Sequence, residues 1–384
     1  MATPGPDDFR SFWIGGFECA THRRKDGVRL DLLRATRHDK FALQDYRACL
    51  TRGLGTVRDG LRWHRIETSR GHYDWSSWLP MVEAAEEAGV EVIWDLCHYG
   101  WPDFIDPRGD DFIPAFADYA AAVAQTHHAA TGRPMRVCPI NEINFLTWAM
   151  EVGYIGPSLD GKPIGWMKTR LVAAAIAAEK AMCAVSPGHR LTWAEPLINV
   201  PPPNHAPATI ERANVLQESQ FQAYDMLLGR LDSELGGHDG MVHAIGLNYY
   251  PSNQWYSTGG PIPMGHHEYR PLSDMLIDYW QRFGKPMFIA ETGAENTGRA
   301  PWLHHVCDEV RTAMRAGVPM TGICLYPVTD YPGWDDSRHC PVGLFDYAGA
   351  DGERPVHEAF AAEVERQQAL FADFARERAA QAIA

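Results

Sequence analysis

The hydrophobic positions of this chain alternate between short apolar runs and longer amphipathic stretches from one end to the other. The short runs are rich in β-branched and aromatic residues, as buried strands are, and the longer stretches carry apolar residues at helical spacing. Gly or Pro closes several longer stretches just before the next run, as Gly89 and Pro286 do, and both residue types end helices. The pattern predicts strands at residues 12–20, 55–63, 90–97, 135–143, 190–197, 242–250, 286–292 and 320–328. It predicts helices at residues 77–88, 113–130, 167–185, 213–231, 272–283, 302–316 and 356–378.

Eight strands that alternate with helices predict a (βα)8 TIM barrel. Such a barrel needs about 250 residues, so the rest of the chain belongs to loops. Segments 198–212 and 251–271 follow the fifth and sixth strands, and we expect them on the face where barrel active sites form. No repeat or linker divides the chain, so residues 1–384 are predicted to form a single domain. The alternative is a doubly wound open sheet, but no glycine-rich nucleotide-binding motif follows a predicted strand.

The charge balance narrows the class of partner. The chain has 35 Lys and Arg against 49 Asp and Glu, a net charge of −14, which is a poor match for nucleic acid or an anionic membrane. A small neutral molecule fits better. The N-terminal residues lack a signal-peptide pattern, and no apolar window reaches roughly 18 residues. The eight Cys form no Cys-x-x-Cys pair. These features predict a cytoplasmic protein with reduced thiols.

Polar residues gather at the ends of the predicted strands. In a barrel, the carboxyl ends of the strands converge on one site. The set includes carboxylates, amides, an imidazole and aromatic rings: Arg58, His98, Asn141, Glu142, Glu195, Asn248, Tyr250, Glu291 and Trp334.

Two of these carboxylates, Glu142 and Glu291, end the apolar strands four and seven. Two carboxyl groups that face one pocket are what glycoside cleavage requires, one to protonate the leaving oxygen and one to attack the anomeric carbon or activate water. A short separation between them means retention of configuration, and a longer one means inversion. Either residue alone is more simply explained as a salt-bridged strand end, but the pair with similar flanks favours catalysis.

These motifs resemble the family 1 glycoside hydrolases, the β-glucosidase group, in order along almost the whole chain. Asn141-Glu142, with Gly153-Tyr154 downstream, is similar to the family's Asn-Glu-Pro and Gly-Tyr, although Ile143 replaces the Pro. The segment 288–293 resembles the nucleophile strand. The resemblance implies that Glu142 is the acid/base and Glu291 the nucleophile.

Further segments carry the same resemblance. Arg58 and the Trp-His-Arg after it resemble the family motif whose first Arg supports the nucleophile, and Asn248-Tyr249-Tyr250 resembles the one whose second Tyr hydrogen-bonds it. His98 in the turn that includes Trp101 resembles a sugar-binding His. Trp334 lies at the spacing of the strand-eight motif. The resemblance thus implies that Arg58, Tyr250 and Asn141 support the catalytic pair. It adds His98, Trp101, Asn248 and Trp334 as candidate substrate ligands.

The chain also departs from the family. Gly333 stands where the family has a Glu that binds sugar hydroxyls, and His22 stands in place of a sugar-binding Gln. A replacement carboxylate could come from Glu18, from Glu195, or from Asp335 or Asp336 after Trp334, and the sequence leaves this choice open. Because the two Asp would repel a phosphate, phosphorylated sugars are disfavoured.

The sequence therefore predicts a retaining β-glycosidase that acts on a small or oligosaccharide glycoside, with no cofactor. Its glycone, aglycone and oligomeric state are left open. Transglycosylation by the same residues and a carbohydrate-binding barrel without turnover are the alternatives. The pairs 127–128, 266–267 and 304–305 of adjacent His lack a third ligand at metal spacing, so no metal is expected.

Overall fold

The computed structural model describes residues 9–383, so the start of the N-terminal segment lies outside the described residues. Parallel strands form one curled sheet in the order β7-β6-β5-β2-β1-β11-β10-β9-β8. Their bounds are β1 Trp13–Gly16, β2 Thr56–Gly60, β5 Glu91–Cys97, β6 Arg136–Ile140, β7 Arg190–Leu191, β8 Glu195–Pro196, β9 Ile245–Asn248, β10 Met287–Thr292 and β11 Met320–Leu325.

The sheet closes because β7 and β8 are two pieces of one strand position. β7 pairs with β6, β8 pairs with β9, and Thr192 between them bridges to Ala244 just before β9. The sheet therefore has eight strand positions around a closed barrel, with the fifth divided. This confirms the predicted (βα)8 TIM barrel.

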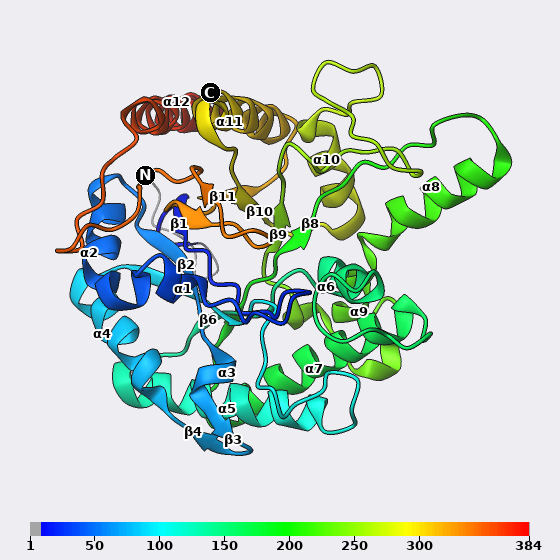
Figure 1. The fold of residues 1–384 in the computed structure, drawn as a ribbon. Coiled ribbons are helices and arrows are strands. Elements are labelled where there is room, and N and C mark those ends of the chain that lie inside the picture. Colours follow the sequence, from blue (N-terminus) through cyan, green and yellow to red (C-terminus); the bar gives the residue numbers. More distant parts are fainter. Residues whose placement is uncertain (1–8, 384) are drawn as a thin grey trace.

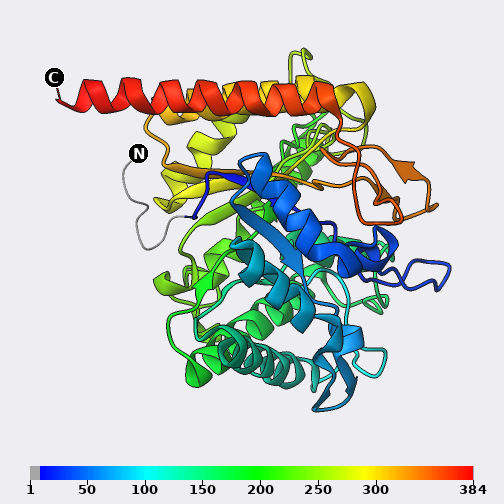
Figure 2. The same ribbon diagram turned by 90° about the vertical axis from the view of Figure 1, so that its left-hand side faces the viewer.

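Helices surround the strands, as Figure 1 shows in a view along the barrel. Their bounds are α1 Leu32–Ala35, α2 His38–Thr51, α3 Trp63–Ile66, α4 Leu79–Ala88, α5 Phe112–Thr131, α6 Ile143–Glu151, α7 Ile164–Val185, α8 Pro207–Ser219, α9 Gln222–Leu227, α10 Leu272–Phe283, α11 Arg299–Arg315 and α12 Glu358–Ile383. The loops contain two short antiparallel hairpins. One pairs β3 Glu67–Ser69 with β4 His72–Tyr73, and the other pairs β12 Tyr331–Pro332 with β13 His339–Cys340. The long helix α12 lies along α11 at one side of the barrel (Figure 2).

The predicted elements differ from the observed ones in several places, among them the expected strand 190–197, which is divided into β7 and β8. The expected helix 213–231 is divided into α8 and α9, because Gln220 turns its side chain inward to accept a hydrogen bond from the N–H of Ile198. The expected strand 135–143 ends at Ile140, since Glu142 adopts a left-handed backbone (φ 46°) and α6 begins beside it. Helix α2, between the first two strands, was not predicted. It carries mixed polar and apolar residues with a weak helical pattern.

The loops after the strands lie at one end of the barrel and hold the polar strand-end residues. Helix α8 projects from the barrel at this end (Figure 1), and Ala213 is its buried residue. None of the described helices is long and apolar enough to cross a membrane.

Candidate active site

A cavity of about 1170 Å³ opens at the carboxyl ends of the strands, and both predicted catalytic residues, Glu142 and Glu291, line it. Glu18, His98, Tyr250, Trp334 and Asp335 line the same cavity. The fold thus brings side chains from the first, third, fourth, sixth and seventh strands, and from the loop after the eighth, to one place. Arg58 and Asn141 lie directly beneath, fully buried and hydrogen-bonded to each other.

Glu291 stands at the end of β10, and two side chains donate hydrogen bonds to its carboxyl group. Nη1 of Arg58 donates to its Oε1 at 2.6 Å, and the hydroxyl of Tyr250 donates to its Oε2 at 2.8 Å. Each oxygen of the carboxyl group thus has its own donor, which fixes the orientation of the group. Glu291 is 4% exposed, so it meets the cavity while its charge is compensated from below.

Arg58 is itself fixed by a second carboxylate. Nε and Nη2 of Arg58 donate to the two oxygens of Asp95 at 3.0 and 2.7 Å, and Nη2 also donates to Oδ1 of Asn141 at 2.5 Å. Asp95 in turn lies 2.9 Å from Nδ1 of His98. Because Asp95 and Asn141 bind the planar guanidinium through Nε and Nη2, its Nη1 points to β10, where it donates to Glu291 and to the carbonyl of Ala290.

Glu142 lies in an environment that favours its neutral form. It is nearly buried, it faces the negative charge of Glu291, and Tyr99 donates a hydrogen bond to its Oε2. Burial, followed by the charge of Glu291, raises the pKa of Glu142 to about 7, against the opposing effects of Tyr99, Asn248 and His98. The two carboxyl groups of the cavity therefore differ in electrostatic environment, which is how acid and base roles are separated.

The position of Glu142 depends on Glu195. Glu195 is fully buried, and its two oxygens accept hydrogen bonds from the backbone N–H groups of Ile143 and Asn144 at 2.8 and 2.9 Å. These are the first N–H groups of α6, which otherwise have no partner within the helix. Burial raises the pKa of Glu195 to about 8. Glu195 does not line the cavity, so the structure places it behind Glu142 and outside the cavity.

Glu18 lies at the wall of the cavity with few protein partners. The N–H of Ala20 donates to its Oε1 at 2.9 Å, and Nε2 of His98 is 3.8 Å from the same oxygen. No other hydrogen bond to its carboxyl group is formed by the described residues. Burial raises the pKa of Glu18, and the nearby charge of Glu291 acts in the same direction.

The remaining sequence candidates take different places. Asp335 lines the cavity and accepts from the hydroxyl of Tyr154 at 3.3 Å. His22 lies behind Trp334, with ring centroids 4.8 Å apart, and burial lowers its pKa to about 3. Trp101 packs against the backbone of Gly156. The structure therefore places His22 and Trp101 outside the set of cavity-lining residues.

Asn248 is fully buried beneath the cavity, next to Glu142. Neither polar atom of its amide forms a hydrogen bond of standard geometry with a described residue. Buried polar atoms are rarely left in this state without a functional reason. Asn248 is thus a group with unused hydrogen-bonding capacity beside the acid.

Tyr99 and Asp95 are two site residues that the sequence analysis did not select. Tyr99 has a left-handed backbone (φ 67°) and is 1% exposed, and it also accepts from the amide of Asn141 at 2.8 Å. Its position directly after His98 was the available signal. For Asp95, the signal was a charged residue within the apolar run of β5.

Two groups of described residues have the composition of a metal site, Cys19-Asp95-His98 and Asp330-His339-Asp346. In the first, Asp95 already binds Arg58 with both oxygens, and burial raises the pKa of the Cys19 thiol. In the second, Oδ1 of Asp330 accepts from the N–H of Gly343 at 2.7 Å. In each group, one carboxylate that a metal ion would need, Asp95 or Asp330, already accepts a hydrogen bond from the protein.

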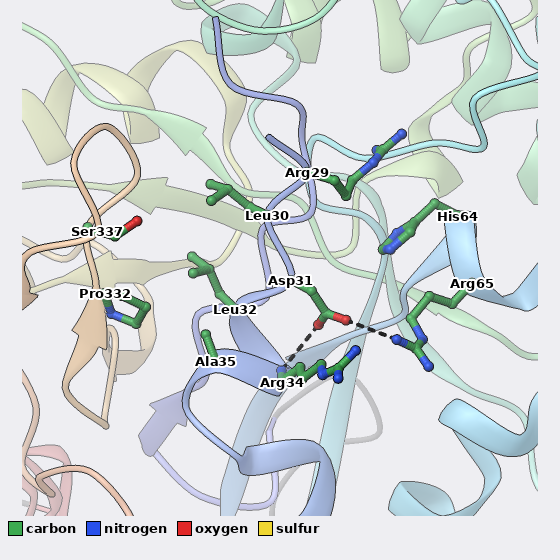
Figure 3. A pocket seen from close by; sticks show the side chains of 11 residues that line it. Arg29, Leu30, Asp31, Leu32, Arg34, Ala35, His64, Arg65, Pro332 and Ser337 are labelled. Carbon is green, nitrogen blue, oxygen red and sulfur yellow. Dashed lines mark hydrogen bonds and ion pairs between the residues drawn. The ribbon is translucent and has the colours of Figure 1, made fainter. Parts of the chain in front are cut away.

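A second hollow of about 540 Å³ borders the cavity at Gly333, which lines both. Arg29, Arg34 and Arg65 surround it (Figure 3). Arg29 pairs with Asp103, and Nη1 of Arg65 lies 3.6 Å from Oδ2 of Asp31. This hollow contains neither carboxyl group of the catalytic pair.

Comparisons with known proteins gave no matching family model and no matching curated protein. Solved structures do match over nearly the full length. The family 1 β-glucosidase from Thermotoga maritima has a TM-score of 0.75 at 14% identity, over 94% of this chain and 97% of that one. The β-glycosidase BGL167 has a TM-score of 0.72 at 19% identity, over 96% and 97%. The β-glycosidase from Thermosphaera aggregans has a TM-score of 0.70 at 15% identity, over 96% and 97%. The chain therefore has the fold of the family 1 β-glycosidases.

Proposed function

We propose that this protein is a retaining β-glycosidase, with Glu291 as the nucleophile and Glu142 as the acid/base. The proposal rests on one observation above all: two carboxyl groups line one cavity, one beside a guanidinium and the other in a buried site that raises its pKa to about 7. This division of roles is what a double displacement requires. The shared fold with β-glycosidases supports it.

In the first step, a carboxylate oxygen of Glu291 attacks the anomeric carbon. The bond from that carbon to the leaving oxygen breaks, and the proton of Glu142 moves to the leaving oxygen. The products are a glycosyl ester on Glu291, a free alcohol and the Glu142 carboxylate. Arg58 and Tyr250, which donate to the two oxygens of Glu291, orient it for the attack.

In the second step, Glu142 removes a proton from water, whose oxygen attacks the anomeric carbon and releases Glu291 as a carboxylate. Esterification has removed the negative charge of Glu291, so the pKa of Glu142 falls between the steps. Loss of that charge is what lets Glu142 change from acid to base.

We assign the sugar-binding role to the cavity-lining residues Glu18, His98 and Trp334, and a supporting role to Asn141 and Asn248. The two Asp near Trp334 disfavour a phosphorylated glycone. All eight Cys are free, and all but Cys183 are buried. Free thiols in this number suit a reducing compartment, so we propose a cytoplasmic location.

The test is hydrolysis of a panel of nitrophenyl β-glycosides by the wild type, Glu291→Gln and Glu142→Gln, with Glu358→Gln on the surface of α12 as the control. We expect activity on at least one glycone, loss of activity in Glu291→Gln, and an unchanged rate in the control. Proton NMR of the first sugar released should show the β-anomer. A first product of α configuration, or full activity in Glu291→Gln, overturns the proposal.

A further inference from the structure

The side of the cavity near α6 carries apolar side chains from several segments. Phe145 and Trp148 come from α6, Ile198 follows β8, Leu216 comes from α8, and Trp255 lies in the loop after β9. We call these five residues the apolar wall. Polar ligands of a sugar, Glu18 and His98, come from the other strand ends, β1 and β5.

The apolar wall begins at the acid. Glu142 directly precedes α6, so Phe145 and Trp148 follow it by one and two turns of the same segment. The ring of Phe145 lies 5.4 Å from that of Tyr99, which donates to Glu142, and 5.6 Å from that of Trp148. A leaving group protonated by Glu142 would therefore lie against these rings.

The wall is open to solvent in part. Trp148 is 47% exposed, and the other four residues of the wall are half-buried. Apolar side chains exposed together at the mouth of a cavity are a common sign of a binding surface. Among the charged residues of the cavity, Arg338 binds both oxygens of Glu295, and Asp335 and Asp336 lie near Trp334. Arg212, exposed on α8, is the charged residue that lines the cavity beside the wall.

We propose that the natural substrate is an amphiphilic glycoside whose aglycone is an extended apolar chain, bound along the apolar wall. This inference rests on the proposed function, because it identifies the wall as the place of the leaving group. The cavity of about 1170 Å³ exceeds the 300 to about 1,000 Å³ typical of small-ligand sites, so it has room for a sugar and a chain. A second sugar in place of the chain could stack on Trp148 but would place its hydroxyls against the aliphatic Ile198 and Leu216.

The test uses binding of two S-glycosides that are not consumed, methyl and n-octyl 1-thio-β-D-glucopyranoside, measured by calorimetry below the micelle concentration of the octyl compound. We expect the wild type to bind the octyl compound about tenfold more tightly or better, because each methylene that leaves water adds to the affinity. Trp148→Ala should weaken octyl binding about fivefold and leave methyl binding unchanged. Leu216→Ser, on a different helix, should act in the same direction.

Phe104→Ala is the matched control, since Phe104 is 46% exposed but does not line the cavity. It should leave both affinities unchanged. Equal binding of the two compounds by the wild type, or equal effects of Trp148→Ala and Phe104→Ala, overturns the inference. Tighter binding of a disaccharide such as cellobiose than of the octyl compound overturns it as well. Hydrolysis without any octyl preference contradicts this inference alone, whereas octyl preference without any hydrolysis contradicts the proposed catalytic function.

Discussion

Nη1 of Arg58 lies 2.6 Å from Oε1 of Glu291, and this ion pair joins the second strand of the barrel to the seventh. Both side chains are almost fully buried. The same guanidinium binds Asp95 with two further nitrogens. Arg58 therefore fixes the direction of Glu291, the proposed nucleophile.

Arg58→Lys should test this fixing. Lysine keeps the positive charge but cannot bind Asp95 and Glu291 at once with a planar fork. We expect kcat/KM to fall about 100-fold, as it does when a preorganised electrostatic contact is lost. Arg311→Lys is the control, since Arg311 is also buried and hydrogen-bonded, to Gln367, but lies away from the cavity. A normal kcat/KM in Arg58→Lys contradicts the assigned role.

The pH dependence of activity should follow Glu142. Its pKa of about 7 means that the proton needed for the first step is lost as the pH rises above that value. We expect kcat/KM to fall about tenfold per pH unit on the alkaline side. In Glu291→Gln the neighbouring charge is gone, so the pKa of Glu142 should be lower, although burial still keeps it above its ordinary value. Carbon NMR of labelled Glu can measure both values, and an unchanged pKa would show that the two groups are not coupled.

The raised pKa of Glu142 also predicts a change in stability. The folded protein binds the proton of Glu142 more tightly than the unfolded chain does. The stability from this group is therefore present below about pH 4.5 and is lost as the pH rises through about 7. Glu142→Gln has a neutral side chain at every pH. We expect it to melt at a higher temperature than the wild type at about pH 8 and at a similar temperature at about pH 5. Calorimetry at the two pH values measures this, and equal melting differences at both would contradict it.

Glu18 should set the specificity for the glycone. Its carboxyl group faces the cavity with one hydrogen bond from the N–H of Ala20, so it can accept from sugar hydroxyls. We expect Glu18→Gln to lower kcat/KM about tenfold or more for the preferred glycoside, as loss of a charged hydrogen bond does. A series of substrates, each without one hydroxyl, can identify the hydroxyl that Glu18 binds. On the substrate that lacks this hydroxyl, kcat/KM of Glu18→Gln and of the wild type should differ little. An equal effect of Glu18→Gln on every deoxy substrate would indicate a purely structural role.

The strands of the barrel could be predicted because each is a buried apolar run bounded by Gly or Pro. That Glu142 and Glu291 share one cavity could be predicted because they end two such runs, and because the sequence around them resembles a known family. The sequence also showed that Gly333 stands where the family has a Glu, so that one sugar-binding carboxylate is missing.

The choice among the replacement carboxylates could not be made from sequence. Glu18, Glu195 and Asp335 all stand at strand ends or in loops, and only their positions in space separate them. Glu195 points to the start of α6, whereas Glu18 meets the cavity. His22 could not be placed either, since its ring supports Trp334 from behind. Tyr99 was missed because a tyrosine beside an apolar strand is most often a core residue.

The division of the fifth strand into β7 and β8 has a consequence for heat inactivation. β7 pairs with β6 and β8 pairs with β9 over two residues each, and Thr192 between them adds one bridge, to Ala244. Local opening should therefore require less energy here than between β2 and β5, and amide exchange at residues 190–196 should be fast by comparison. The carbonyl of Ala194 accepts from the N–H of Glu142, and Glu195 holds the start of α6. Opening between β7 and β8 should release Glu142, the proposed proton donor. On warming, the protein should therefore lose activity before it loses its helices.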